Sequence, residues 1–223
     1  MNKLIIIFLL GLLACSFKKN QSKEMTGQSY IGSTVISSDT SIILDEEFRA
    51  FGTKEYILYV LNSKGDTVFK QADLYFDFEF SDFNNDGLND IVIHRLSNVP
   101  AIQDLLLFDS AKMGFTIVKD FERFPDPKPI PGTKYYFSYH RSGCADSFWD
   151  SDLFSIDNSE THLLGNISGN ECEGKKGIVV TKIIGNEKKV VDTFELDTLE
   201  SYDDRKWGFI ADYWAKNYSK FIK

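Results

Sequence analysis

Short apolar segments separated by turn signals run through this chain from about Ser41 onward, and they constrain its fold more than any other feature. The clearest is DLYFDFEF (73–80), in which apolar residues alternate with Asp77 and Glu79. A period of two is that of a β-strand with one buried face. The segments EYILYVLN and DTVFKQ flank SKGD, which predicts a hairpin turn around Gly65. The pattern therefore predicts a mainly β domain with antiparallel neighbours.

The proline-rich segment FPDPKPIPG (124–132) interrupts this series. It carries four of the five prolines, so it cannot be a central strand and is predicted to be a connection or a covering strap. The remaining strands are predicted over 90–94, 104–109, 115–121, 133–140, 149–157, 161–168, 177–184 and 188–196.

The C-terminal segment has a different period. Its large apolar residues recur at spacings of three and four, which predicts one face of a helix over about 203–221, with Asp203 or Asp204 as the N-cap. These residues are Trp207, Ile210, Trp214, Tyr218 and Phe221. We expect this face to pack on the sheet, and a ligand platform is the alternative. The predicted fold class is an antiparallel, propeller-like or irregular β domain with one C-terminal α-helix.

The first residues are typical of an export signal. Lys3 precedes LIIIFLLGLLA, an apolar run of eleven residues that ends at Cys15 and is too short to span a bilayer. The site LLAC (12–15) resembles the lipobox of bacterial lipoproteins, in which the cysteine carries the lipid. An ordinary signal peptide that contains a cysteine is the alternative. We expect a signal peptide over 1–14, a lipidated Cys15 with a flexible tether over 15–39, and a folded domain over 40–223.

Charge and cysteine content agree with export. Without Lys3, the one charged residue of the predicted signal, the 25 basic residues become 24 against 33 acidic ones, a net charge of −9. This balance disfavours nucleic acid and anionic membrane surfaces as partners, so membrane attachment would come from the lipid on Cys15. The remaining cysteines, Cys144 and Cys172, form an even pair, which predicts a disulfide in an exported protein. Two buried free thiols are the alternative.

The stretch FSDFNNDGLNDIVIH (80–94) contains a pattern typical of calcium loops. Calcium takes six to eight oxygen ligands, and a short loop supplies them when oxygen-bearing side chains fall on alternate residues. The positions that match an EF-hand-like loop are Asp82, Asn84 and Asp86 at 1, 3 and 5, Gly87 at 6, the Leu88 backbone carbonyl at 7 and Asp90 at 9. We predict a calcium site here, and a solvated acidic turn is the alternative.

The same loop departs from an EF-hand in two ways. Position 12 is Ile93, where an EF-hand has a bidentate glutamate, and both flanks are predicted strands instead of helices. A helix–loop–helix calcium sensor is therefore not expected. The calcium affinity should be modest, in the range of roughly 10⁻⁴–10⁻³ M that serves extracellular modules.

Two resemblances follow from these residues. DFNNDGLNDIVI looks like the calcium loop of FG-GAP and VCBS repeats, in which the loop links two strands of a propeller-like blade, but only one clear copy is present. A broader resemblance, over about 73–157, combines the loop, the LLLFD strand, the proline-rich segment and YYFSYHRSGCADSFWDSDLFSID. This region is similar to periplasmic calcium-binding lipoproteins and secreted proteins, some of which inhibit lysozyme-type peptidoglycan hydrolases. This resemblance implies Asp82, Asn84, Asp86 and Asp90 as calcium ligands.

Catalytic motifs are not found. The sequence has no G-x-S-x-G, H-E-x-x-H, P-loop or G-x-G-x-x-G, and His94, His140 and His162 stand singly. Cys144 lies near His140 and Asp146, as in a Cys–His nucleophile, but a disulfide is the favoured role for this cysteine. We therefore assign no catalytic residue, and whether the protein is an enzyme stays open.

The leading functional hypothesis is a lipid-anchored, calcium-stabilised β domain that binds a macromolecule in the cell envelope, at the periplasmic face of the outer membrane or at the cell surface. Its sharpest version is inhibition of a lysozyme-type hydrolase, since such enzymes are often basic and this chain is acidic. The candidate contacts are Arg141, Phe148 and Trp149, because arginine and aromatic residues are common binding anchors. The alternative is that Phe148 and Trp149 are core residues and that Arg141 pairs with a nearby acid. The competing functions are an envelope carbohydrate-active hydrolase and a structural or assembly lipoprotein.

Overall fold

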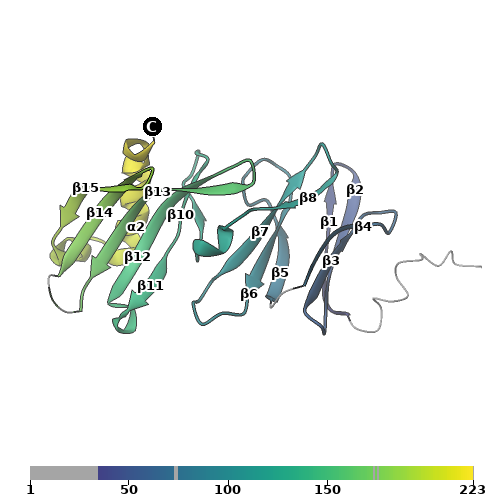
Figure 1. Cartoon of the computed structure of the whole chain (residues 1–223), viewed down its shortest axis with the longest axis horizontal. Coiled ribbons are helices and arrows are strands. Elements are labelled where there is room, and N and C mark those ends of the chain that lie inside the picture. The colour runs from purple at the N-terminus through teal and green to yellow at the C-terminus, as the bar shows by residue number, and fades with distance from the viewer. Residues whose placement is uncertain (1–34, 73–74, 173, 175, 223) are drawn as a thin grey trace, which may run out of the picture.

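The computed structural model describes residues 35–72, 75–172, 174 and 176–222. The predicted signal peptide over 1–14 and the predicted lipid site Cys15 lie outside the described residues. Within the described ranges, three antiparallel sheets follow one another along the long axis of the molecule, and one α-helix lies beside sheet 3 at one end (Figure 1). No helix in these ranges is long and apolar enough to cross a lipid bilayer.

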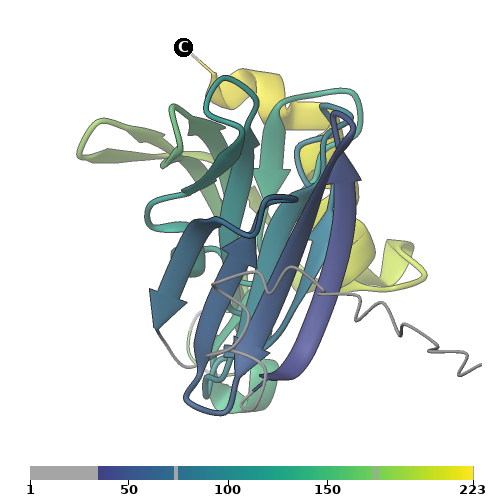
Figure 2. The ribbon, with the colours of Figure 1, turned by 90° about the vertical axis from the view of Figure 1, so that its right-hand side faces the viewer.

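Sheets 1 and 2 are four-stranded meanders of the same topology. Sheet 1 consists of β1 (Val35–Ile43), β2 (Glu46–Thr53), β3 (Ile57–Leu61) and β4 (Thr67–Ala72). Sheet 2 consists of β5 (Tyr75–Ser81), β6 (Asp90–Arg95), β7 (Gln103–Asp109) and β8 (Gly114–Ile117). Four-stranded antiparallel sheets are the units of propeller blades. Here sheet 1 forms one end of the stack, as Figure 2 shows, with sheet 2 behind it.

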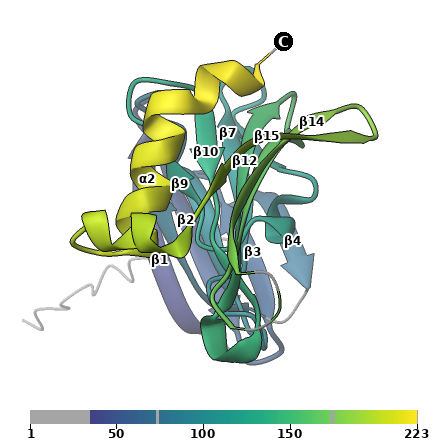
Figure 3. The ribbon, with the colours of Figure 1, turned by 90° about the vertical axis from the view of Figure 1, so that its left-hand side faces the viewer.

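Sheet 3 and the C-terminal helix form the other end. The strands of sheet 3 are β9 (Lys128–Pro129), β10 (Tyr135–Phe137), β11 (His140–Gly143), β12 (Phe148–Asp157), β13 (Glu160–Asn170), β14 (Gly177–Ile184) and β15 (Glu187–Phe194). The helical segments are η1 (Phe121–Arg123), η2 (Cys144–Asp146), η3 (Leu196–Ser201), α2 (Lys206–Asn217) and η4 (Tyr218–Phe221). Figure 3 shows α2 in front of sheet 3, whose outer face it covers.

Three apolar cores separate these layers. The core between sheets 1 and 2 contains Ile43, Phe48, Ala50, Leu58, Val60, Phe78, Ile91, Ile93, Leu106, Phe108 and Phe115. The core between sheets 2 and 3 contains Val92, Leu105, Val118, Phe121, Phe124, Tyr136 and Phe154. The core between sheet 3 and α2 contains Ile130, Tyr139, Trp149, Leu153, Ile167, Ile178, Val180, Leu199, Phe209, Ile210, Tyr213, Trp214 and Phe221.

The position of sheet 2 explains why its central strand β6 carries the continuous apolar run Ile91, Val92 and Ile93. Successive side chains of a strand point to opposite faces. In β6, Ile91 and Ile93 enter the core with sheet 1, whereas Val92 enters the core with sheet 3. A strand that is buried on both faces needs apolar residues at every position, not at every second one.

The predicted fold class is confirmed: the chain is mainly β, with antiparallel sheets and a C-terminal α-helix. The predicted strands overlap β3 to β8, β10 and β12 to β15, and the proline-rich segment contributes only the short strand β9, which pairs with β10.

The predicted boundary of the tether at residue 39 is wrong, because β1 begins at Val35. This strand pairs with β2 along its length, with Asp39 opposite Ala50. The Asp39 carboxylate also accepts a hydrogen bond of 3.0 Å from the backbone N–H of Phe80 in sheet 2. These contacts make residues 35–39 part of the folded domain.

The predicted N-cap is also wrong. The helix α2 begins at Lys206, with Arg205 as its N-cap in the left-handed region (φ 49°) and with no side-chain cap. The backbone N–H of Arg205 bonds to the carbonyl of Tyr202 at 2.9 Å, so a tight turn delays the start of the helix. The predicted packing face is confirmed for Ile210, Trp214 and Phe221, which are buried.

Candidate functional site: the acidic loop and the cleft beside the disulfide

The acidic loop, residues 82–89, connects β5 to β6 and folds its side chains onto its own backbone. The two carboxylate oxygens of Asp82 accept hydrogen bonds of 3.0 Å each from the N–H groups of Asp86 and Gly87. The Asn84 side-chain oxygen accepts from the same Asp86 N–H at 3.0 Å. Gly87 has φ 88°, a conformation that favours glycine. The loop therefore curls so that side-chain oxygens of Asp82 and Asn84 share its concave side.

Asp90 closes the loop from a fully buried position. Its carboxylate accepts backbone hydrogen bonds from Phe83 at 3.2 Å and from Phe108 at 2.9 Å. Burial raises the pKa of Asp90 to about 6, and the negative charge of Asp86 adds to this, although the hydrogen bonds act in the opposite direction. The loop thus places an acidic group where water cannot solvate its charge.

An aromatic contact anchors the loop over the core between sheets 2 and 3. The Phe83 ring stacks on Tyr136, with 5.1 Å between the ring centroids. Burial raises the pKa of Tyr136 to about 12, with further increases from the charges of Asp90, Asp86 and Asp82. Because all three carboxylates act on one hydroxyl, they lie in the same neighbourhood.

The donor chemistry of this loop fits a hard cation, since every side chain that could serve as a ligand offers oxygen. Within the part of the chain that the structure describes, no three carboxylate, imidazole or thiolate side chains are placed to hold a metal by themselves. A metal at this loop would therefore also need the Asn84 amide and backbone oxygen. Ile93, at position 12, is buried in the core between sheets 1 and 2, and both flanks are strands, so the predicted departure from an EF-hand is confirmed.

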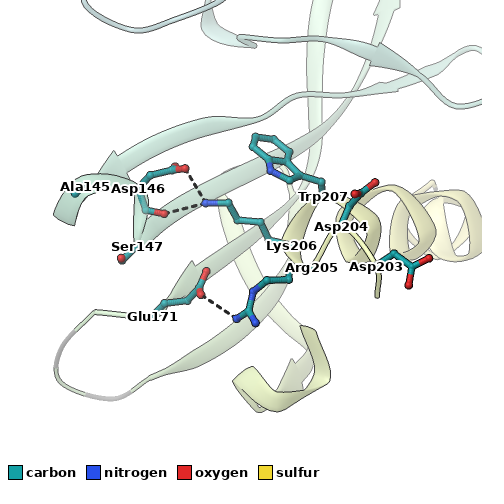
Figure 4. A pocket seen from close by; sticks show the side chains of 9 residues that line it. All are labelled: Ala145, Asp146, Ser147, Glu171, Asp203, Asp204, Arg205, Lys206 and Trp207. Atoms are coloured by element: carbon teal, nitrogen blue, oxygen red, sulfur yellow. Dashed lines mark hydrogen bonds and ion pairs between the residues drawn. The ribbon is translucent and has the colours of Figure 1, made fainter. Parts of the chain in front are cut away.

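A cleft of about 510 Å³ opens between η2 and the beginning of α2 (Figure 4). Its lining consists of Ala145, Asp146, Ser147, Glu171, Asp203, Asp204, Arg205, Lys206 and Trp207. A second hollow of about 260 Å³ shares Asp146 and Trp207 with the first. Its other lining residues are Val99, Pro100, Ala101, Asp126, Tyr139, His140 and Arg141.

Two ion pairs join the opposite walls of the first hollow. Lys206 Nζ lies 2.8 Å from Asp146 Oδ2 and donates to the Asp146 backbone oxygen at 2.9 Å. Arg205 Nη2 lies 3.7 Å from Glu171 Oε2. Figure 4 shows both basic side chains extending from the helix toward the acids on the opposite wall.

The disulfide holds these two acids in place. Cys144 pairs with Cys172 at a Cα–Cα distance of 6.4 Å, which confirms the predicted bridge. Cys144 precedes Asp146 by two residues, and Cys172 follows Glu171 directly. The bridge therefore links the two segments that hold the start of α2, and Cys144 has no free thiol for nucleophilic catalysis.

The electrostatics of the cleft keep Asp146 ionised. Partial burial would raise the pKa of Asp146, but hydrogen bonds from Lys206 and Tyr139 hold that pKa below its usual value. The Tyr139 hydroxyl donates to Asp146 Oδ1, and burial together with this bond raises the pKa of Tyr139. One carboxylate thus joins Tyr139, in the connection between β10 and β11, to a lysine of α2.

Trp207 lies between the two hollows and is 42% exposed. Its ring centroid is 3.8 Å from that of Tyr139. The ammonium groups of Lys206 and Lys128 lie 5.6 Å and 5.8 Å from the ring centroid. Trp207 therefore departs from the predicted packing face: the core takes Phe209, Ile210, Tyr213 and Trp214 from α2, and Trp207 lies outside it.

The structure corrects one predicted contact residue. Trp149 is fully buried between sheet 3 and α2, and its Nε1 donates to Glu171 Oε1 at 2.9 Å, so it is a core residue and not a surface contact. Phe148 is half-buried, whereas Arg141 is exposed and lines the second hollow. The sequence analysis thus selected a loop that borders the cleft but missed Trp207, Lys206 and the two acids.

The histidines stay apart from one another. His140 Nε2 lies 3.7 Å from Asp152 Oδ2, and this interaction raises the pKa of His140 despite the opposing effect of burial. His94 Nε2 lies 3.5 Å from Glu79 Oε1. Each of these two histidines is next to a carboxylate, and the three histidines lie on different strands, β6, β11 and β13.

Comparisons with known proteins give little further information. No family model matches this chain, and no curated protein matches it. Among solved structures, the chain is similar to the structure of a Xanthomonas type IV secretion system related protein, with 12% sequence identity and a TM-score of 0.46. The similarity covers 70% of this chain and 93% of that one. Similarity at this level transfers neither a fold family nor a function.

Proposed function

We propose that this protein is an exported, lipid-anchored and calcium-stabilised binding protein of the cell envelope. The apolar run before Cys15 and the paired Cys144 and Cys172 support export. The lipid on Cys15 would attach the domain to a membrane, at the periplasmic face of the outer membrane or at the cell surface.

The observation that carries a binding function is the exposed segment at residues 141–145, which contains the end of β11 and the start of η2. All five residues are exposed, and the disulfide at Cys144 and the hydrogen bonds of Asp146 hold the segment at both sheet 3 and α2. A surface that is ordered before binding loses less conformational entropy when a partner binds. Arg141 at the start of this segment remains the candidate anchor, because arginine is enriched among residues that dominate binding energy.

A lysozyme-type hydrolase is the first partner class to test, since a basic enzyme would be attracted to this acidic chain. We expect the purified protein to bind at least one member of a lysozyme panel in calorimetry and to slow its lysis of peptidoglycan. Arg141→Ala should weaken that binding at least about tenfold, which corresponds to about 1.4 kcal/mol. The matched control is Lys188→Ala, an exposed lysine on the β15 strand. If the protein binds none of the panel, the hydrolase version is wrong.

The calcium proposal assigns ligands to the acidic loop. The side chains of Asp82, Asn84, Asp86 and Asp90, together with the Leu88 carbonyl, would hold the ion and neutralise three neighbouring carboxylates. Two observations support this: the all-oxygen donor set of the loop and the left-handed Gly87 at its bend. The ion would pin the connection between β5 and β6.

Calcium should therefore raise the melting temperature. For a dissociation constant of roughly 10⁻³–10⁻⁴ M, about 10 mM calcium would add about 1.4–2.7 kcal/mol to the free energy of unfolding. That corresponds to roughly 3–10 °C for a chain of this size. Calorimetric melting in EDTA and after added calcium measures the difference. Asp86→Ala should abolish the response, whereas Asp157→Ala, an exposed acid at the end of β12, should retain it. A melting temperature that ignores both EDTA and calcium contradicts the metal site.

A further inference from the structure

Trp207 is an exception among the tryptophans of this chain. Trp149 and Trp214 are both fully buried, and each has its Nε1 bonded to a neighbouring side chain. Trp207 instead keeps 42% of its surface exposed, while its ring contacts the Tyr139 ring at a centroid distance of 3.8 Å. A large aromatic side chain that is fixed in place but exposed inside a hollow is typical of a ligand-binding surface.

The charges around Trp207 indicate the kind of ligand. In the first hollow, Asp146 pairs with Lys206 and Glu171 pairs with Arg205, so these acids and bases neutralise one another. The rim adds the exposed acids Asp203 and Asp204. Beside Trp207 the second hollow adds the basic Arg141, and Lys128 lies 5.8 Å from the Trp207 ring centroid, so the site carries charges of both signs. The acidic chain as a whole would repel an anionic ligand. A neutral ligand meets no such penalty.

The same ion pairs present fixed hydrogen-bonding groups. Asp146 also accepts a hydrogen bond from Tyr139, and Glu171 accepts one from Trp149. Because each carboxylate oxygen has two lone pairs and the guanidinium of Arg205 has five N–H groups, these bonds and the ion pairs together leave bonding capacity on each side chain. Hydrogen-bond acceptors and donors therefore lie next to one another in the first hollow. A hydroxyl group both donates and accepts, so a ligand with several hydroxyls can bond to a donor and an acceptor at once.

The second hollow adds an apolar wall. Val99, Pro100 and Ala101 from the connection between β6 and β7 line it together with Trp207 and Tyr139. The three residues are exposed, and the backbone oxygen of Ala101 is held by the N–H of Asp126 at 2.9 Å. This wall can cover a methyl group of the ligand, while Trp207 covers a flat apolar face.

From these features we propose that the cleft binds a neutral oligosaccharide. The C–H face of one sugar ring would pack on the exposed part of Trp207, and its hydroxyls would bond to Asp146, Glu171 and Arg205. An N-acetyl methyl group would lie against the wall at Val99 and Pro100. This inference goes beyond the proposed protein partner, and it does not depend on that partner or on calcium.

Calorimetric titration of the purified protein with chitotetraose tests the proposal, because this neutral probe carries both hydroxyls and N-acetyl groups. We expect saturable binding, weaker binding of cellotetraose, and no binding of a tetralysine peptide. Trp207→Ala should weaken chitotetraose binding at least about tenfold. Trp207→Phe should retain part of it, and Val190→Ala, an exposed apolar residue on β15, should leave it unchanged.

A second measurement is independent of binding heat. Since Trp149 and Trp214 are buried, quenching of fluorescence by acrylamide reports mainly on Trp207, and chitotetraose should protect it from quenching. Far-ultraviolet circular dichroism checks that each variant is folded. Three results would overturn the proposal: no binding of either saccharide up to about 10 mM, unchanged affinity in folded Trp207→Ala, or binding of the peptide alone. Hydrolase binding that fails while chitotetraose binds would reject only the proposed protein partner.

Discussion

Trp149→Ala should lower the free energy of unfolding by about 3–5 kcal/mol, the range for removing a large aromatic side chain from a packed core. Trp149 is fully buried between sheet 3 and α2, so its loss leaves a cavity that the surrounding strands cannot fill. The substitution also removes the hydrogen bond between its Nε1 and Glu171. Urea denaturation at a fixed excess of calcium measures the loss.

Trp207→Ala is the matched control for this prediction. Removal of the exposed Trp207 side chain should lower the free energy of unfolding by less than about 1 kcal/mol. The contrast separates a core role from a binding role for the two tryptophans. An equal loss in both variants, or a loss at Trp149 below about 1 kcal/mol, would contradict the assigned positions.

Gly169 gives an independent check on the packing of Trp149. A Cβ at this position would lie 2.0 Å from Cε2 of the Trp149 ring, so Gly169→Ala should be strongly destabilising. The same substitution in a Trp149→Ala background has room for the added methyl group. The losses in the free energy of unfolding from Gly169→Ala and Trp149→Ala should therefore be less than additive in the double variant. Full additivity would show that the Trp149 ring does not fill the space next to Gly169.

Loss of the disulfide should have the second largest effect. The bridge joins residues 28 positions apart, and closing a loop of this size is worth roughly 3–4 kcal/mol in the chain-entropy model. The variant Cys144→Ala/Cys172→Ala should therefore unfold at a lower urea concentration. Because Asp146 and Glu171 hold Lys206 and Arg205 next to this bridge, we expect the loss to extend to the start of α2.

A thiol reductant supplies the control for this experiment. It should lower the stability of the parent protein toward that of the double variant, and it should leave the double variant unchanged. Hydrogen exchange at the first turn of α2 should rise in the double variant. Unchanged stability of the parent, after thiol titration has shown that the bridge is reduced, would contradict the prediction.

Local patterns in the sequence were sufficient to predict most of the strands. In DLYFDFEF, the alternating pattern places Phe78 inside and Asp77 and Glu79 outside, as the structure confirms. The flanks of the acidic loop were likewise predicted as strands, because IVI directly follows Asp90. These predictions succeed because strand pairing between neighbours depends on residues that are close in the chain.

The first two strands, β1 and β2, were not predicted, and for β1 the reason is that its position depends on distant residues. β1 is rich in serine and threonine, and its positions alternate between exposed and half-buried along most of its length. Its place in the fold depends on pairing with β2 and on the bond from Asp39 to Phe80, which lies 41 residues further along the chain. Such a contact leaves no periodic signal in the sequence.

The local chemistry of this protein can be read from the order of its residues: the oxygen-rich turn at 82–90, the paired cysteines and the apolar run before Cys15. Tertiary structure alone decided which surface is available for binding. Lys206 meets Asp146 across 60 residues, and this contact places the start of α2 beside the disulfide. Helical spacing grouped Trp207 with the buried residues of its helix, but the core at sheet 3 leaves Trp207 42% exposed, and which helix residues this core buries is set by contacts between segments far apart in the chain.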